Sequence, residues 1–517
     1  MGEGADKPLI DQILEVVNER VKLDDPLVQL ITYVYFSRFT DNPLNLFLRG
    51  ESSIGKTYVT RSTVEALGED EDVWWLGGLS PASLAHEHGQ LYYQNTPLDQ
   101  SLMSSKAKIK AEHPDWDRLQ VQREYEEQLR AWNEKLRESY FLVDLTGKLL
   151  IFLESPSLET FDRLRPLLSH DKHEISFKFV DKTGKGQLRT VHVKLRGWPA
   201  TIFMSTKEKY VADLSTRSLT ATPNLSEEKI RKALEVTAKK YAYPPVSLTR
   251  KELQDRVEWV KARLKVGMGK LDVLIPYAEE LPKFVQLYLH RVMRDFDHFL
   301  QIVKMNALVN LKLRDVYVET ENCKYVLATF DDMYSALNAW RSVEETTLTG
   351  ASGSALRVFD SLIKPAGPVT NYHMLVEKSR LIFQRPLSSA TLRKYVNVLA
   401  DIGLVDVEPD PEDKRRKVIR VIGEKQKMLK NEIHEFKAFF KPENLKAWWN
   451  ELKKLCAKTP LLYIPQISPL QPQLTESLTE DEKLNIAYEK MCIISERVFL
   501  HTFFKTQNGE KNENEAK

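Results

Sequence analysis

The sequence predicts an α/β fold built around a parallel sheet and extended by further domains on its carboxyl side. A strand-like segment, 44–48, and a short, continuously apolar segment, 149–153, predict two strands, and the second is typical of a strand that is buried on both faces. Segments with helical spacing of apolar residues follow both of them. A glycine-containing loop, residues 50–57, joins the first strand to its helix. Strands that alternate with helices in this way indicate an α/β core.

The composition narrows the class of protein. The 517 residues include 75 Lys+Arg and 73 Asp+Glu, with a net charge of +2, and 42% are hydrophobic. These values exclude fibrous and wholly disordered proteins, and the length predicts about three domains. We expect a cytoplasmic protein that does not cross a membrane, because the chain lacks an apolar run of about 18 residues and a signal peptide, and its three cysteines are widely spaced.

The first half of the core is expected to run from two short helices within 9–40 to the strand at 73–76. Residues 58–67 continue the glycine-containing loop as a helix. A highly charged insertion, about 104–139, carries apolar and aromatic residues at roughly helical spacing. It predicts a long exposed helix, which is either a simple solvated face or a brace against a neighbouring subunit.

The second half of the core contains an expected β-hairpin, residues 174–193. Two alternating segments are separated there by Asp-Lys-Thr-Gly-Lys-Gly-Gln, which is typical of a hairpin turn. A helix at 157–168 precedes the hairpin and an apolar strand at 200–204 follows it. The expected domains are an N-terminal helical segment (1–40), the α/β core (41–225), a helical lid (226–342), a linker (343–354), a winged helix (355–422), a C-terminal helical region (423–506) and a disordered tail (507–517).

The loop after the first strand matches the phosphate-binding pattern G-x-x-x-x-G-K-[ST]. Glycines allow backbone N–H groups to approach phosphate oxygens, and the helix N-terminus favours negative charge. Lys56 would reach the β- and γ-phosphates of ATP, and the Thr57 hydroxyl would hold Mg²⁺. The alternative is a coincidental Gly-Ser loop. The expected nucleotide-binding residues are Gly50, Ser52, Ser53, Gly55, Lys56, Thr57 and Tyr58.

A carboxylate, Glu154, follows the apolar segment 149–153. At the end of a strand beside the phosphate loop it could act as the general base that activates water. The residue before it is Leu153, where such ATPases usually have an aspartate, so Mg²⁺ would depend on Thr57, phosphate and water. The alternative is a glutamate that caps the next helix.

Taken together, these elements resemble the AAA+ ATPases, specifically the minichromosome maintenance (MCM)-like and primase-associated helicases of archaea and mobile elements. The resemblance spans roughly residues 40–420. The segments that carry it are GESSIGKT (50–57), GGLSPASL (77–84), KLLIFLES (148–155), RPLLSHDKHEISFKFVDKTGKG (165–186), RGWPATIFMSTK (196–207), DLSTRS (213–218), IPYAEEL (275–281) and RVMRDFDHFLQIVKMNAL (291–308).

The resemblance implies further catalytic residues. Thr206, or Ser205 beside it, is expected to hold the attacking water, and Arg217 is expected to reach the γ-phosphate bound to a neighbouring subunit. Arg217 could instead pair locally with an aspartate. Arg294 is similar to the arginine of the family's lid, with Arg291 as a rival. An arginine that acts between subunits implies a homo-oligomer, most simply a hexameric ring. Because fewer than about 50 residues precede the phosphate loop, we expect neither the family's N-terminal collar nor a primase domain.

Two segments are candidates for DNA binding. Residues 172–197 contain seven basic and two acidic residues, and the resemblance implies that a hairpin here holds single-stranded DNA in the ring's channel. The expected contacts are Lys182, Lys185 and Arg189; the alternative is a solvated hairpin whose lysines protect an edge. The winged helix would contact duplex DNA, or would instead bind protein. Its candidate residues are Arg393, Lys394, Arg415 and Arg416.

Three functions are therefore compatible with the sequence. The first is an ATP-driven DNA helicase or translocase of the AAA+ class. The second is an ATP-switched initiator, loader or transposition regulator that assembles on duplex DNA without unwinding it. The third is a protein-remodelling or defence ATPase. The hairpin favours the first, whereas Leu153 and the missing collar favour the second.

Overall fold

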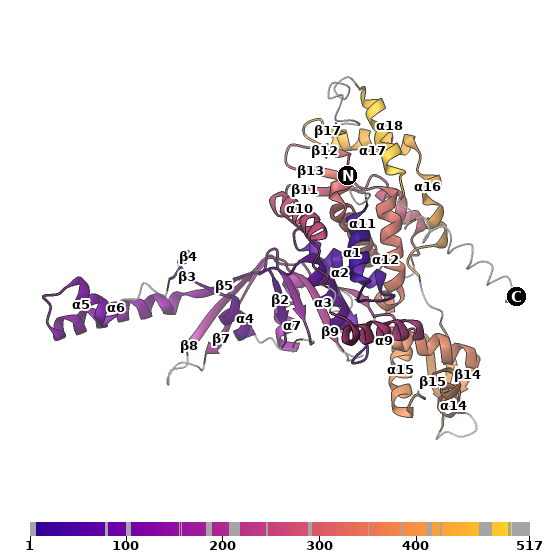
Figure 1. Ribbon diagram of the computed structural model, residues 1–517, viewed down its shortest axis with the longest axis horizontal. Helices are drawn as coiled ribbons and strands as arrows, with labels where there is room; N and C mark the ends of the chain where they lie inside the picture. The colour runs from indigo at the N-terminus through magenta and orange to yellow at the C-terminus, as the bar shows by residue number, and fades with distance from the viewer. Residues whose placement is uncertain are drawn as a thin grey trace. The chain divides into compact units, whose positions relative to one another are not determined.

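The computed structural model of the protein divides into two compact units (Figure 1). The first unit comprises residues 1–74, 149–153 and 200–517, and the second comprises residues 75–148 and 154–199. No helix in the described part of the chain is long and apolar enough to cross a membrane. The structure describes residues 7–77, 81–99, 105–154, 156, 158–181, 189–205, 218–244, 247–287, 292–349, 351–383, 386–410, 416–423, 427–464, 478–494 and 498.

A five-stranded sheet lies at the centre of the first unit, in the order β10-β1-β9-β6-β2. Strand β1 pairs in parallel with β9 and β10, and β9 pairs in parallel with β6. Every residue of β1, β6, β9 and β10 is buried, as the apolar segments predict. The parallel sheet of an α/β fold is thus confirmed. The bounds are β1 (Asn45–Arg49), β2 (Val73–Leu76), β6 (Leu149–Phe152), β9 (Ala200–Ser205) and β10 (Leu219–Ala221).

The strand order reverses direction between β1 and β9. From β1 the chain proceeds to β2 at the far edge, whereas from β9 it proceeds to β10 on the other side of β1. Ligands of open α/β sheets bind outside the carboxyl ends of the strands at such a reversal. The loop after β1 therefore lies at the position where this fold binds ligands.

Helices from the N-terminal segment pack together with those of the expected lid. Helix α1 packs against α3, α10 and α11, and α2 packs against α3, α11 and α12. Helix α2 is buried on all sides from Leu27 to Ser37, as in a helix enclosed by others. The bounds are α1 (Leu9–Val17), α2 (Asp25–Ser37), α3 (Lys56–Leu67), α9 (Glu227–Ala242), α10 (Lys251–Gly267), α11 (Val292–Val309) and α12 (Phe330–Thr349).

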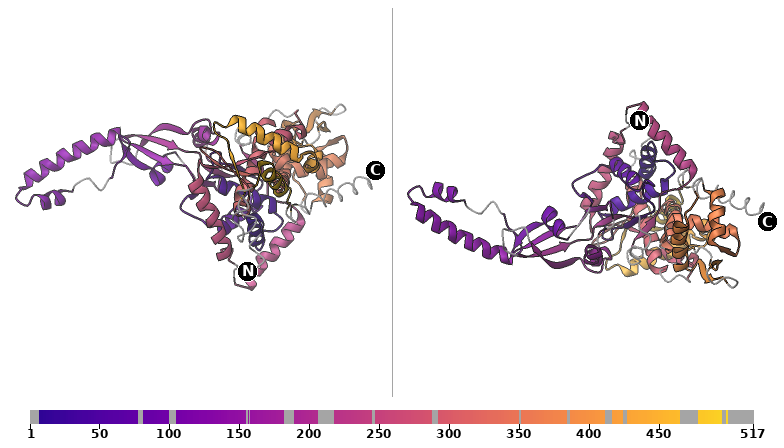
Figure 2. Two further views of the ribbon diagram at one scale, coloured as in Figure 1. Left: turned by 90° about the horizontal axis from the view of Figure 1, so that it is seen from above. Right: turned by 90° about the horizontal axis from the view of Figure 1, so that it is seen from below.

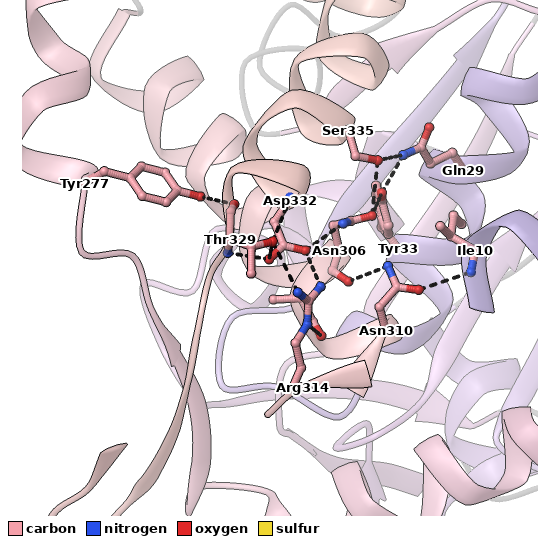
Figure 3. Close-up of polar contacts among 11 residues, drawn as sticks. Ile10, Gln29, Tyr33, Tyr277, Asn306, Asn310, Arg314, Thr329, Asp332 and Ser335 are labelled. Carbon is pink, nitrogen blue, oxygen red and sulfur yellow. Dashed lines mark hydrogen bonds and ion pairs between the residues drawn. The ribbon is translucent and has the colours of Figure 1, made fainter. Parts of the chain in front are cut away.

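A buried polar network joins α2, α11 and α12 (Figure 3). The Tyr33 hydroxyl donates to Asn306 Oδ1 at 2.6 Å, and the Asn306 amide donates to Asp332 Oδ1 at 2.7 Å. Asp332 is fully buried and also pairs with the Arg314 guanidinium. Polar groups that are buried away from water need such hydrogen-bond partners. The network therefore fixes how these three helices pack.

The expected helical lid also contains strands. A four-stranded sheet has the order β11-β13-β12-β17, and its last strand comes from the expected C-terminal helical region, 423–506. These strands are only three or four residues long, too short to give a clear alternating pattern in the sequence. The bounds are β11 (Leu271–Leu274), β12 (Tyr317–Glu319), β13 (Lys324–Leu327) and β17 (Leu461–Tyr463).

A smaller helical cluster with a three-stranded antiparallel sheet follows, and we refer to residues 353–421 as the C-terminal cluster. The expected linker 343–354 differs from the structure, since α12 continues to Thr349. The Thr346 hydroxyl donates a hydrogen bond to the carbonyl of Thr220, which attaches this part of α12 to strand β10. The elements of the C-terminal cluster are α13 (Gly353–Val358), β14 (Val369–Asn371), α14 (Tyr372–Ile382), α15 (Ser389–Asp401), β15 (Val405–Pro409) and β16 (Lys417–Val421).

The C-terminal region is mainly helical in its described part, and it also contributes strand β17. Aromatic side chains of α16 pack against Tyr277 and Phe330, with Phe436 at 5.8 Å and 6.2 Å from these rings. The expected tail 507–517 lies outside the described residues. The helices are α16 (Phe436–Phe439), α17 (Pro442–Leu455) and α18 (Glu480–Met491).

The second unit contains its own five-stranded sheet, in the order β4-β3-β5-β8-β7. The expected hairpin is present as the antiparallel pair β7 and β8, but it belongs to this second sheet. Helices α5 and α6 form the charged insertion, lie side by side and extend away from this sheet (Figures 1 and 2). The bounds are α4 (Pro81–His88), β3 (Gln90–Tyr93), β4 (Thr96–Pro97), α5 (Lys106–Glu112), α6 (Arg118–Glu138), β5 (Tyr140–Asp144), α7 (Leu158–Leu168), β7 (Glu174–Asp181) and β8 (Arg189–Arg196).

Candidate functional site

The loop between β1 and α3 has the backbone conformation of a tight anion-binding turn. Gly50 and Gly55 adopt φ values of 135° and 96°, which L-residues with side chains rarely adopt. A Cβ at Gly50 would lie 2.3 Å from the end of the Ile54 side chain, which would have to move, and the positive φ would strain any residue with a side chain. Ser53 also has a positive φ, of 67°. The loop that matches the phosphate-binding pattern therefore also has the positive φ values that such a loop requires.

Lys56 is the first residue of α3 and is 8% exposed. Its Nζ donates hydrogen bonds to the carbonyl oxygens of Gly50 at 2.8 Å and Glu51 at 2.6 Å. Burial lowers the pKa of the Lys56 ammonium, and the charge of the Glu51 carboxylate opposes that shift. The loop thus wraps around a buried cation, which is the group that would neutralise a phosphate.

The start of α3 presents the other groups that could hold a nucleotide. Thr57 is exposed, and its hydroxyl lies 3.4 Å from the sulfur of Met204 in β9, which places the loop beside the end of that strand. Tyr58 is 39% exposed, and the Lys240 Nζ lies 4.5 Å from the centre of its ring. The hydroxyl, the helix N-terminus and the lysine fit a phosphate chain with its Mg²⁺.

Two parallel strands end at the same edge of the sheet as the loop. Ser205 is the last residue of β9 and pairs with Arg49, which immediately precedes Gly50. Glu154 follows strand β6 in the chain, two residues after its end, and is exposed. Ser205 is therefore adjacent to the strand that carries the loop. Thr206 and Arg217 lie outside the described residues.

The arginine expected from the lid, Arg294, lies in the first turn of α11 and is exposed. Helix α11 packs against α2 and α12. Its rival Arg291 lies outside the described residues. The roles of both arginines stay predictions.

The hairpin strands contribute to a polar and aromatic face of the second sheet. The register places four side chains in one row across four strands, namely Tyr92, Tyr140, His192 and Lys178. The rings of Tyr92 and Tyr140 are stacked, with centroids 5.9 Å apart, and the Nζ of Lys194 lies 4.2 Å from the Tyr140 ring. We refer to these five residues as the tyrosine–lysine face.

The opposite face of this sheet is apolar. It carries Leu91, Val143, Val193 and Leu195, all of which are buried. Alternation along each strand therefore separates a core face from the tyrosine–lysine face. Of the residues expected to bind DNA here, Lys182 and Lys185 lie outside the described residues, and Arg189 begins β8 opposite Asp181.

The candidates in the C-terminal cluster lie on α15 and near β16. Arg393 and Lys394 are consecutive, exposed residues of α15, and each lies over a tyrosine ring. The carbonyl of Arg416 accepts a hydrogen bond from the Asp410 amide at 2.9 Å, next to the start of β16. Arg415 lies outside the described residues. The charged side chains of α15 are thus accessible to a ligand.

Some contacts near the site have no signal in the sequence. The hydroxyl of Tyr395 in α15 donates to the Glu51 carboxylate of the phosphate loop, across 344 positions of the chain. Tyr92 and Tyr140 face each other from segments separated by the charged insertion. The alternating segment Gln90–Tyr93 could have indicated a strand, but not its partner.

Comparisons with known proteins give little further information. No family model matches the chain, and no curated protein matches it. Among solved structures, the chain is similar to a "putative ATPase" from Cytophaga hutchinsonii, with 9% identity and a TM-score of 0.33 over 65% of this chain and 86% of that one. The resemblance to MCM-like helicases stays a prediction, and the function proposed below rests on this chain's own residues.

Proposed function

We propose that the protein binds ATP with Mg²⁺ at the 50–57 loop and hydrolyses it. The observation that carries this proposal is the buried Lys56 ammonium, held by the carbonyls of Gly50 and Glu51 at the start of α3. This arrangement lies where the strand order of the parallel sheet reverses. A cation, a helix N-terminus and two glycines at such a position favour a nucleoside triphosphate as the ligand.

Each residue has a defined role in the proposed reaction. Lys56 exchanges its two carbonyl contacts for phosphate oxygens, and the backbone N–H groups of residues 52–57 bind the remaining phosphate charge. Thr57 would hold Mg²⁺, which neutralises charge on the phosphates. Glu154 would accept a proton from the attacking water. Ser205 or Thr206 would orient that water.

The finer proposal is a DNA helicase or translocase of the AAA+ class that works as a ring, most simply a hexamer. Arg217 of one subunit would then stabilise the charge on the phosphate bound to its neighbour. The tyrosine–lysine face supports a nucleic-acid partner, because aromatic rings stack on bases and lysines neutralise phosphates. The C-terminal cluster would act as a winged helix on duplex DNA through Arg393, Lys394, Arg415 and Arg416.

A second candidate function is an ATP-switched DNA-binding protein that does not unwind. The exposed pair Arg393 and Lys394 on α15 and the unusual Leu153 favour it. A protein-remodelling or defence ATPase is the third candidate, with the C-terminal cluster binding protein instead of DNA.

Nucleotide binding tests the proposal directly. We expect a fluorescent ATP analogue to bind the wild-type protein with Mg²⁺ and not to bind Lys56→Ala. The control Lys232→Ala changes a partly exposed lysine of α9 that pairs with Glu228, and it should bind like wild type. Phosphate release with and without single-stranded and duplex DNA then separates the candidates. Strand displacement supports a helicase, whereas duplex binding without displacement supports a switch. Failure of the wild type to bind any nucleoside triphosphate would reject the proposal.

A further inference from the structure

Tyr395 connects the C-terminal cluster to the phosphate loop. It lies on α15, is 2% exposed, and donates its hydroxyl hydrogen to the Glu51 carboxylate. Glu51 is the second residue of the loop, and its own carbonyl accepts a hydrogen bond from Lys56. Glu51 is therefore held at two places. Its side chain is bonded to α15, and its backbone carbonyl is bonded to Lys56, the proposed phosphate-binding lysine.

Other contacts fix the cluster in this position. The Gly353 amide donates to the Thr222 hydroxyl at 3.0 Å, and the Arg357 guanidinium donates to the Leu225 carbonyl at 2.7 Å. Thr222 follows strand β10, and its methyl group lies 3.4 Å from the place that a Cβ on Gly50 would occupy. The beginning of the cluster is thus attached to a segment that itself contacts the phosphate loop. These contacts hold α15 where Tyr395 can reach Glu51.

The charge of Glu51 makes its orientation important. A carboxylate beside the loop attracts the Lys56 ammonium, which is the group needed to bind phosphate. If the same carboxylate were free to turn towards the phosphates, it would repel them and compete for Lys56. A hydrogen bond from a neutral tyrosine satisfies the carboxylate without adding charge. The contact therefore restrains an unfavourable charge at an anion-binding site.

We propose that Tyr395 is a positioning residue of the nucleotide site, which keeps the Glu51 carboxylate away from the phosphates. This inference rests on the proposed function, since it concerns the same loop. It makes the C-terminal cluster part of the nucleotide site as well as a separate binding element. Arg393 and Lys394 directly precede Tyr395 in the same helix, so a ligand on their exposed face lies close to this contact.

The test is a double-mutant cycle measured by titration with a fluorescent ATP analogue. Tyr395→Phe keeps the ring and removes the hydroxyl, and we expect it to weaken nucleotide binding about fivefold to tenfold, as for loss of one typical hydrogen bond. Glu51→Gln removes the charge and should bind at least as tightly as wild type. The combination Tyr395→Phe/Glu51→Gln should restore the affinity, because no carboxylate is left to restrain.

Control variants separate the possible outcomes. Tyr372→Phe removes a hydroxyl from the same cluster and should leave nucleotide affinity unchanged, whereas Lys56→Ala should abolish binding. Unchanged or tighter binding by Tyr395→Phe, or no rescue by Glu51→Gln, would overturn the inference while leaving the nucleotide site intact. Absence of binding by the wild type would overturn both proposals. Hydrogen exchange of residues 50–57 gives a second readout, and we expect faster exchange in Tyr395→Phe than in Tyr372→Phe.

Discussion

The Nζ of Lys56 lies 2.8 Å from the carbonyl oxygen of Gly50, to which it donates a hydrogen bond. The glycine directly follows strand β1 and the lysine begins helix α3, so this bond closes the loop around a buried ammonium. The loop can tighten to this extent because Gly50 has no side chain. Its φ of 135° is strained for any residue with a side chain, and a Cβ there would displace the end of the Ile54 side chain.

We expect Gly50→Ala to weaken ATP binding more than tenfold and to lower the free energy of unfolding by about 1–3 kcal/mol, because an alanine at this positive φ is strained and its methyl group would displace the Ile54 side chain within the phosphate loop. Gly367→Ala is the matched control. Gly367 also has a positive φ, of 109°, but a Cβ there meets nothing within 4 Å. It should therefore lose some stability and keep its affinity for ATP. Equal affinities in the two variants, measured by titration, would contradict this prediction.

Glu154→Gln should keep ATP binding and lose hydrolysis. An amide cannot accept the proton of the attacking water, so the rate of phosphate release should fall by roughly a hundredfold or more. Glu138→Gln, at the end of α6, provides a control that removes a charge from another part of the second unit. A variant of Glu154 that hydrolyses ATP at the wild-type rate would exclude the residue as the general base.

The tyrosine–lysine face predicts a salt-dependent affinity for single strands. The affinity for a labelled oligonucleotide is to be measured at several salt concentrations, and its logarithm plotted against the logarithm of the salt concentration. For Lys178→Ala we expect the slope to decrease by about 1, as for the loss of one phosphate contact. Tyr92→Ala should instead weaken binding by about 1–3 kcal/mol with little change in that slope, since stacking carries no charge. Lys232→Ala serves again as the control. Wild-type slopes and affinities in both variants would reject this surface as the binding face.

Asp332→Ala should destabilise the first unit strongly. Asp332 is fully buried, pairs with Arg314 and accepts from the Asn306 amide at 2.7 Å (Figure 3). Removing one partner of a buried pair leaves the other charge uncompensated and costs about 3–5 kcal/mol. Asp272→Ala breaks the partly exposed pair with Lys304 and should cost less than about 1 kcal/mol. Chemical denaturation of both variants measures the difference, and equal losses would contradict it.

His434 should make the stability of the protein depend on pH. Burial, followed by the charges of Arg341 and Lys427, lowers the pKa of His434 to about 4 from its usual 6.5. Because the folded pKa lies below the unfolded one, the neutral ring is favoured in the folded state. The contribution of the neutral His434 ring to the free energy of unfolding should therefore be fully present above about pH 6.5 and be lost as the pH decreases towards 4. The thermal stability of His434→Gln should depend less on pH over this range than that of the wild type. The same pH dependence in both proteins would show that His434 is not its cause.

The sequence by itself determined the parallel sheet and the phosphate loop. The strands β1, β6 and β9 are short apolar segments, and the glycines and Lys56 stand at fixed spacings between a strand and a helix. Such signals are local, because burial on both faces and positive φ values constrain residues that are near one another in the chain. The hairpin strands β7 and β8 were predicted from their alternation for the same reason.

Only the tertiary structure decided which of these segments meet. The hairpin was expected within the core, yet it pairs through β8 with β5 in a second sheet. The strands β11, β12 and β13 lie within a segment expected to be helical, and Tyr395 reaches Glu51 across 344 positions. A short strand is stabilised by pairing with a strand that is distant in the sequence, and a hydroxyl by its hydrogen-bond acceptor. The residues around either one do not show which partner it has. Pairing over such distances depends on the packing of the whole unit.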